Sequence, residues 1–185
     1  DGTFDITKLD SKGNMTEQSV KLKDGTLHST TYNADGTKRE RIYHPDNTVT
    51  ARRTNSDGST VVTKFDSSKN MVERVETSAN GTTTKQTFNT DGTKRTTITD
   101  KEGYVKDYIY NKDGKVMSSH EGNPDGTFKN NKYDSTGNLI ESVSTSKNGS
   151  YTIERYNADG SYTRHVTEAN KVTIDSTYDK SGNLV

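Results

Sequence analysis

Hydrophobic residues occur along this chain in short, regularly spaced groups rather than in long runs. A turn signal, usually glycine, recurs every 11 or 12 residues from position 2 to position 182. Between the turns lie about seven residues rich in Thr, Val, Ile, Tyr, Lys and Arg, a mixture that includes the strand-forming types. No segment carries apolar residues at helical spacing for three turns. The pattern predicts short strands joined by tight turns.

Two forms of turn make up this lattice. In the first, Asn and Asp precede the glycine, as in YNADGT (32–37) and YNADGS (156–161). In the second, Gly-Asn precedes a large apolar residue, as in YDSTGNL (133–139). Asn and Asp tolerate the left-handed backbone region and Gly enters it without a steric penalty, so a type I turn followed by a bulge is expected. The structural turn glycines are expected to include Gly36, Gly58, Gly92, Gly114, Gly137, Gly160 and Gly182.

Short turns force neighbouring strands to run antiparallel. The sequence therefore predicts an all-β fold, an antiparallel meander of about 16 strands, one per 11–12 residues, in a single twisted or spiral sheet with little conventional core. Residues 1–185 are expected to form one continuous repeat array that is a fragment of a longer repeat region. Other residues replace glycine at Asn47, Lys69 and Lys171. The steps of 12 residues are expected to reflect a different turn length.

Large side chains recur at fixed places in the repeat. The second residue after the turn glycine is often apolar, and the seventh residue after it is often aromatic. In antiparallel neighbours these two positions approach one another near the strand ends, where each such pair contributes about 0.2–1 kcal/mol. An aromatic ladder is therefore expected along the sheet, formed by Tyr32, Tyr43, Phe65, Phe88, Tyr110, Tyr133, Tyr156 and Tyr178.

Composition supports a thin, ordered sheet. Only 25% of the residues are hydrophobic, whereas globular proteins have about 45–50% on a slightly broader count. Disorder usually accompanies a high net charge, but here 26 Lys and Arg balance 26 Asp and Glu. The zero net charge gives no basic footprint for nucleic acid, and no apolar run is long enough for a membrane span. Neither a nucleic-acid partner nor membrane insertion is expected.

Candidate chemistry is sparse. The N-x-D-G turns resemble calcium loops, but the first ligand and the distal Glu of such loops are missing, so turn capping is favoured. The four histidines have no ligand spacing, and the chain has no cysteine, nucleophile elbow or Gly-rich phosphate loop. We therefore expect no catalytic, cofactor or metal residues, no cofactor and no enzymatic activity.

The motifs YDSTGNL (133–139) and YDKSGNL (178–184) resemble the tyrosine–aspartate motif of YD/RHS repeats. That resemblance implies a bacterial cell-surface or secreted protein whose strands coil into a spiral sheet, sometimes a shell around a toxin. The Arg-rich, more apolar strands expected of a shell lining are missing here. Variant MORN repeats have a similar rhythm, and single-layer β-sheet surface lipoproteins have a similar composition.

The favoured hypothesis is a structural repeat segment of a bacterial cell-surface or secreted protein, acting as a spacer, stalk or filament-building module. The alternatives are an adhesin that binds a protein or glycan through a sheet face or edge, and a part of a toxin-encapsulating shell. The absence of Trp slightly disfavours glycan recognition through aromatic stacking. The expected partners are neighbouring repeats of the same chain and, by edge-to-edge self-association, other copies. The expected location is extracellular or on the cell surface.

Overall fold

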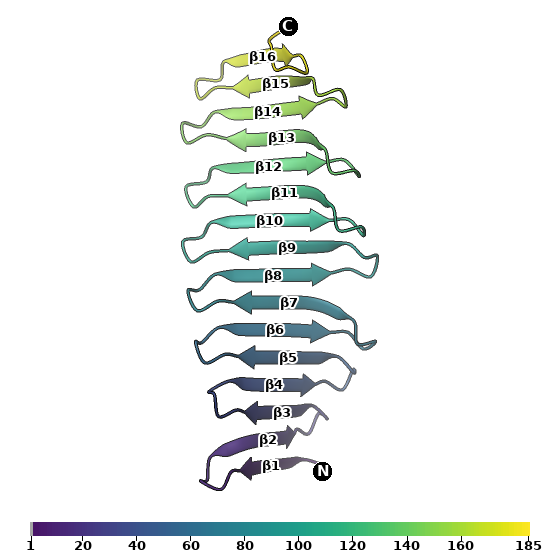
Figure 1. Ribbon diagram of the computed structural model, residues 1–185, viewed down its shortest axis with the longest axis vertical. Coiled ribbons are helices and arrows are strands. Elements are labelled where there is room, and N and C mark those ends of the chain that lie inside the picture. The colour runs from purple at the N-terminus through teal and green to yellow at the C-terminus, as the bar shows by residue number, and fades with distance from the viewer. Residues whose placement is uncertain (1) are drawn as a thin grey trace. The chain divides into compact units, whose positions relative to one another are not determined.

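The computed structural model describes residues 2–185. The chain divides into two compact units, Asp1–Phe88 (unit 1) and Asn89–Val185 (unit 2), and each contains eight strands (Figure 1). The strands of unit 1 are β1 (Phe4–Leu9), β2 (Met15–Lys21), β3 (Leu27–Tyr32), β4 (Lys38–Tyr43), β5 (Val49–Thr54), β6 (Thr60–Phe65), β7 (Met71–Thr77) and β8 (Thr83–Phe88). The strands of unit 2 are β9 (Lys94–Thr99), β10 (Val105–Tyr110), β11 (Val116–Gly122), β12 (Phe128–Tyr133), β13 (Leu139–Thr145), β14 (Tyr151–Tyr156), β15 (Tyr162–Thr167) and β16 (Thr173–Tyr178).

Strand order follows the sequence from β1 to β16, without a crossover and without closure into a barrel. Within each unit, every strand pairs antiparallel with the strand that precedes or follows it (Figure 1). Residues 2–185 contain no helix, and so none that could span a lipid bilayer. The predicted fold class, an all-β antiparallel meander of sixteen strands, is confirmed.

The turns have one backbone geometry throughout. In the turn after β3, the amide of Gly36 donates to the carbonyl of Asn33 at 3.0 Å, and the amide of Asn33 donates to the carbonyl of Thr37 at 2.9 Å. The same two hydrogen bonds recur in the turn that contains Gly13 and in the turn that contains Lys69. A type I turn followed by a residue in the left-handed region gives this pattern. The turns are therefore of equal length.

The extra residue of the 12-residue steps lies in a strand, which corrects the expected difference in turn length. Register shifts occur in the β1–β2, β6–β7, β10–β11 and β12–β13 pairs. In the first of these, Lys8 pairs with Glu17 and Leu9 pairs with Met15, so Thr16 is the additional residue. Such a β-bulge lengthens β2, β7, β11 and β13 to seven residues.

The sheet has no conventional hydrophobic core. No hydrophobic side chain among the described residues is buried, and the buried residues are the small hydroxyl residues Thr26, Thr96, Ser119 and Ser142. Thr96 and Ser119 lie directly opposite the larger Tyr108 in the neighbouring strand. Longer side chains therefore shield small residues on the same face, and hydrogen-bonded backbone ladders and cross-strand pairs stabilise the sheet.

Candidate functional site

The seven predicted turn glycines all have positive φ, which lies between 77° and 99°. The three residues that replace glycine in the lattice also enter the left-handed region: φ is 65° at Asn47, 68° at Lys69 and 70° at Lys171. A side chain there crowds the following carbonyl oxygen and costs about 1–2 kcal/mol. These residues therefore occupy strained positions within an otherwise uniform set of turns.

The two turn forms use their side chains differently. In the Asn-x-Asp-Gly form, the Asp35 carboxylate accepts hydrogen bonds from the amide of Thr37 at 2.9 Å and from its hydroxyl at 2.7 Å. In the Asp-x-x-Gly-Asn form, Asp10 accepts from the amides of Lys12 and Asn14 at 2.8 and 2.9 Å. Hydrogen bonds from Thr37 and Asn14 lower the pKa values of the Asp35 and Asp10 carboxyls, respectively.

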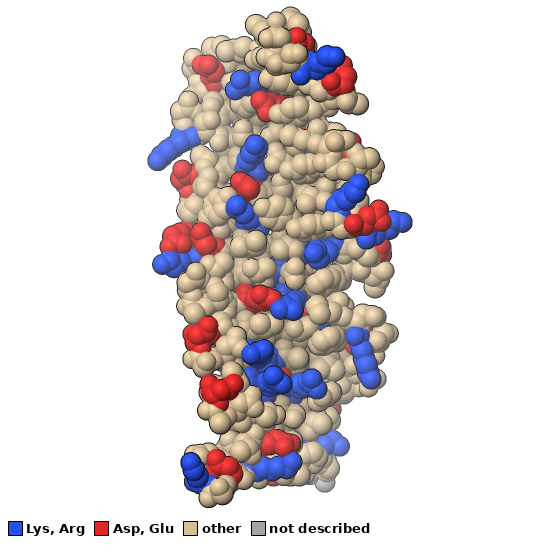
Figure 2. Space-filling model, in the orientation of Figure 1, with Lys and Arg blue, Asp and Glu red and all other residues tan. Residues whose placement is uncertain are grey.

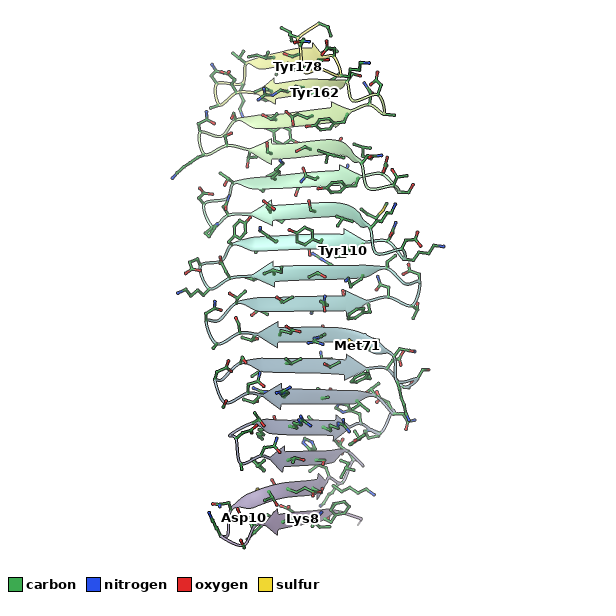
Figure 3. The ribbon with its side chains drawn as sticks, viewed as in Figure 1. Lys8, Asp10, Met71, Tyr110, Tyr162 and Tyr178 are labelled. Atoms are coloured by element: carbon green, nitrogen blue, oxygen red, sulfur yellow. The ribbon has the colours of Figure 1, made fainter. Side chains whose placement is uncertain are left out.

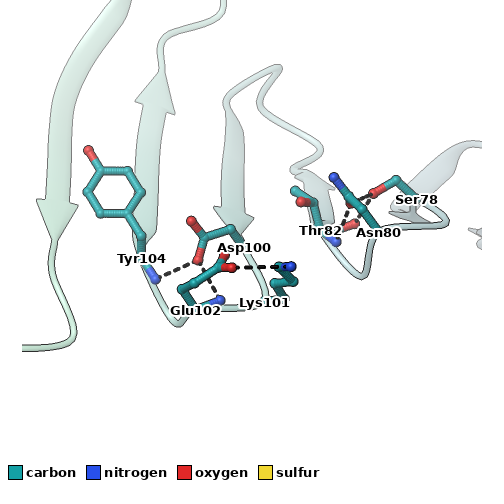
Figure 4. A network of polar contacts seen from close by, with 7 residues as sticks. All are labelled: Ser78, Asn80, Thr82, Asp100, Lys101, Glu102 and Tyr104. Carbon is teal, nitrogen blue, oxygen red and sulfur yellow. Dashed lines mark hydrogen bonds and ion pairs between the residues drawn. The ribbon is translucent and has the colours of Figure 1, made fainter.

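Figure 4 shows two turns with other sequences, Ser78–Thr82 and Asp100–Tyr104, that are capped in the same way. The side-chain oxygen of Asn80 accepts hydrogen bonds from the Ser78 hydroxyl and from the Thr82 amide, at 2.5 and 3.0 Å. In the other turn, Asp100 accepts from the backbone amides of Glu102 and Tyr104 at 3.0 and 2.8 Å. Turn oxygens are thus engaged in capping the turn itself. Among residues 2–185, no three His, Asp or Glu side chains form a group that could hold a metal ion.

In unit 1, aromatic side chains and their aliphatic neighbours form a row that crosses the strands near the C-terminal ends of the even-numbered strands. Tyr43 lies opposite Leu27 and Val49, and Val49 lies opposite Phe65. Phe88 ends β8, which is an even-numbered strand like β4 and β6, so it lies on the same side of the unit as Tyr43 and Phe65. Tyr32 ends the odd-numbered strand β3 and lies outside the row, opposite Lys38, whose Nζ is 5.5 Å from its ring centroid.

In unit 2, tyrosines contact one another directly. The ring centroids of Tyr162 and Tyr178 are 4.5 Å apart with an interplanar angle of 8°, and those of Tyr156 and Tyr162 are 5.3 Å apart (Figure 3). Tyr110 has the Lys94 Nζ 4.5 Å from its ring centroid. Tyr133 lies opposite Leu139 at a bulge. Cross-strand contacts of this kind stabilise a sheet. The predicted single ladder does not include Tyr32, which ends an odd-numbered strand.

Two histidines of unit 2 join polar cross-strand groups. His165 Nδ1 lies 2.7 Å from an oxygen of Asp175, and its Nε2 lies 3.3 Å from the Thr167 hydroxyl. His120 Nδ1 lies 2.5 Å from the Asn130 side-chain oxygen, and a Cβ at Gly122 would lie 2.8 Å from the same ring. Gly122, the one glycine outside the turn lattice, therefore leaves room for this imidazole. The Asp175 side chain is 80% exposed, so the Thr–His–Asp group is open to water.

A cluster of arginines in unit 1 stands apart from these contacts. A hollow of about 330 Å³ is lined by arginines of β4, β5 and β7 and by the smaller residues Ala51, Val61 and Thr63. Glu40 and Arg52, which pair with each other at 3.9 Å, complete its lining. Figure 2 shows Lys and Arg side chains gathered over β4 and β5. We call this feature the arginine hollow and define it by Arg39, Arg41, Arg53 and Arg74 together with those three smaller residues.

Register explains why the arginine hollow forms. Arg41 lies opposite Ala51, Ala51 opposite Thr63, and Thr63 opposite Arg74, so one row across four strands has small residues between two arginines. In the adjacent row, Arg39 lies opposite Arg53, Arg53 opposite Val61, and Val61 opposite Glu76, the partner of Arg74. Directly opposite residues in a pleated sheet share a face. Short side chains therefore form the floor, and long basic side chains surround it.

The arginines of the hollow differ in their partners. Arg74 Nε donates to Glu76 at 2.6 Å. By contrast, Arg39, Arg41 and Arg53 are exposed and form no ion pair with a carboxylate of residues 2–185. The Arg53 charge contributes to the lowered pKa of Asp35, less than the Thr37 hydrogen bonds do. Three guanidinium groups on one face thus lack a carboxylate partner.

The arginine hollow was not predicted from the sequence, because charges of both signs alternate along the chain and obscure it. Arg39 and Arg53 are equally distant from Asp46, in the turn between β4 and β5. A hairpin with a fixed turn pairs residues that are equidistant from it, so this symmetry was the available signal.

No protein-family model matches the chain, and a search of the curated proteins finds no match.

Proposed function

We propose that the protein is a structural repeat segment of a bacterial cell-surface or secreted protein, acting as a spacer, stalk or filament-building module. One observation carries this proposal: the described residues bury no hydrophobic side chain. The order of each unit therefore comes from the turns within each repeat and from the hydrogen-bonded ladders between neighbouring strands. Proteins built in this way change length by whole repeats, because each repeat contacts only its neighbours.

The surface of the described residues also favours a non-enzymatic role. Catalysis requires a pocket that excludes water around groups with matched pKa values. The Thr–His–Asp group of unit 2 instead includes an aspartate whose side chain is 80% exposed. The extracellular location, and a relationship to YD/RHS repeats, belong to this proposal on the strength of the YDSTGNL and YDKSGNL motifs.

Deletion of one two-strand repeat tests whether length depends on repeat number. Removal of residues 37–58 joins Gly36 to Ser59, which preserves the Asn-x-Asp-Gly-Ser turn and removes β4 and β5. Spin labels on Lys12→Cys and Ala79→Cys, at turns of unit 1, report the distance across it; the chain has no other cysteine. We expect a folded protein whose label separation is shorter by about 10 Å, which is two strand spacings.

Deletion of a single strand provides the matched control. Removal of residues 37–47 also leaves an intact turn sequence, because Thr48 then follows Gly36. Because an odd number of residues is lost, the side chains of β5 and of the strands after it move to the opposite face of the sheet relative to those of β3. We expect this variant to lose stability or to aggregate. Unfolding of the two-strand deletion, or an unchanged label separation in it, would contradict the spacer proposal.

A further inference from the structure

The arginine hollow contains positive charge that the fold itself does not use. Arg39 and Arg53 lie directly opposite each other in β4 and β5, and neither forms an ion pair with a described carboxylate. Like charges placed opposite each other on neighbouring strands destabilise a sheet. Arg41 adds a third unpaired guanidinium on the same face. An arrangement that disfavours folding and lies around a hollow is typical of a binding surface.

We propose that the arginine hollow binds a linear sulfated polysaccharide, with Arg39, Arg41 and Arg53 donating hydrogen bonds to its sulfate oxygens. The planar guanidinium group presents its N–H groups as a fork that matches two oxygens of one oxyanion. Opposite residues on neighbouring strands lie about 5 Å apart, and alternate residues of one strand lie about 7 Å apart. Three long side chains at this spacing can hold one sulfate together or two successive sulfates of an extended chain.

The floor of the arginine hollow favours a carbohydrate over a nucleic acid. Single-stranded nucleic acids bind where aromatic rings stack on successive bases, whereas Ala51, Val61 and Thr63 form this floor. The aromatic residue of β4, Tyr43, lies at the strand end opposite Leu27 and Val49. Small aliphatic groups leave room for a sugar ring between the charges.

Recognition through sulfate does not depend on tryptophan, which the chain lacks. The inference is also separate from the spacer role. The protein could act as a spacer without binding this ligand. It could equally bind the ligand without acting as a spacer. The two-strand deletion and the binding experiment therefore fail independently.

Binding of dextran sulfate to the full chain tests the proposal, with unsulfated dextran as the neutral polymer. We expect saturable binding of dextran sulfate and none of dextran. Replacing the three arginines together (Arg39→Gln, Arg41→Gln and Arg53→Gln) removes several charge-assisted hydrogen bonds, and we expect at least about a tenfold loss of affinity. Thermal unfolding of this variant should show a retained fold, because the substitutions relieve repulsion.

A second triple variant controls for net charge. Lys12, Lys112 and Lys180 are exposed turn residues outside the hollow, and changing each to Gln removes the same three positive charges. We expect its affinity for dextran sulfate to stay within about twofold of the unmodified protein. Equal losses in the two triple variants would overturn the assignment of the site. Equal or tighter binding of a single-stranded oligonucleotide of matched charge would overturn the ligand class.

Discussion

Units 1 and 2 share one backbone plan but place charge on it differently. In unit 2, Glu141 lies between two cations, with Lys132 Nζ at 2.8 Å and Arg155 Nε at 3.2 Å from its carboxylate. In unit 1, Arg39 and Arg53 occupy opposite positions in neighbouring strands without a carboxylate partner. Unit 1 also has a compensated network, in which Glu73 lies between Lys64 and Lys85. The same cross-strand geometry therefore supports compensated ion networks in both units and, at Arg39 and Arg53 of unit 1, an uncompensated basic surface.

The contrast shows which parts of the repeat are constrained. Turn hydrogen bonds recur at every step of both units, whereas the residues on the faces change from strand to strand. A side chain on a single-layer sheet contacts only cross-strand and same-face neighbours, so a substitution there leaves other repeats unaffected. Binding properties can therefore differ between units while the scaffold stays the same.

The largest expected effect is common to both units and concerns their turns. Gly36→Val in unit 1 and Gly160→Val in unit 2 each place a β-branched residue at a φ of 81° or 88°. We expect each to lower the free energy of unfolding by about 2 kcal/mol. Chemical denaturation of the two variants measures this. Unequal losses would show that the turns of the two units are not equivalent.

Replacing a non-glycine turn residue with glycine is the control for these turn variants. Lys69→Gly in unit 1 and Lys171→Gly in unit 2 remove a side chain from φ values of 68° and 70°. We expect each to raise the free energy of unfolding by about 0.5–1 kcal/mol, since relief of strain exceeds the added freedom of the unfolded chain. A loss of stability in both would contradict the assigned strain.

An intermediate effect is expected from the tyrosine cluster of unit 2 at alkaline pH. Burial, together with a 2.7 Å hydrogen bond that its hydroxyl donates to Glu154, raises the pKa of Tyr156 from 10.0 to about 12. Between these values the unfolded chain releases the proton and the folded chain retains it, so stability falls as pH rises through this window. We expect Tyr156→Phe to make this loss shallower.

Ultraviolet titration of tyrosinate checks the assignment. The absorbance change near pH 12 should disappear in Tyr156→Phe. Glu154→Gln is the matched variant, because it keeps the ring and removes the negative charge that holds the proton. We expect it to lower the pKa of Tyr156. No change in either variant would show that another tyrosine titrates there.

The smallest expected effect is a change in the free energy of unfolding that has opposite signs in the two units when one arginine is replaced. Arg53→Gln removes one of two opposed positive charges in unit 1, so we expect it to raise the free energy of unfolding by about 0.2–1 kcal/mol. Arg155→Gln in unit 2 removes a partner of Glu141, and we expect a loss of similar or smaller size, because that pair is exposed to solvent. Denaturation at low and high salt should show both differences shrinking with ionic strength. The same sign for both variants would refute the contrast between the units.

The number of strands and the positions of the turns follow from the sequence alone. The hydrogen bonds that close and cap the YNADGT and YDSTGNL turns from within connect residues at most four positions apart, so a short stretch of sequence specifies them. Antiparallel order then follows because the connections are too short for any other. These features repeat, and one repeat predicts the next.

Which side chains meet depends on how the strands pair in the folded protein. The bulge residue Thr16 shifts the register of its strand, and turn signals alone do not locate that shift within the 12-residue step. Tyr32 lies apart from the row of Tyr43 because it ends an odd-numbered strand. The opposition of Arg39 and Arg53 likewise depends on the register of one hairpin. Side chains alternate faces with a period of two, so a one-residue shift exchanges the two faces, and pairing between strands had to fix what each face presents.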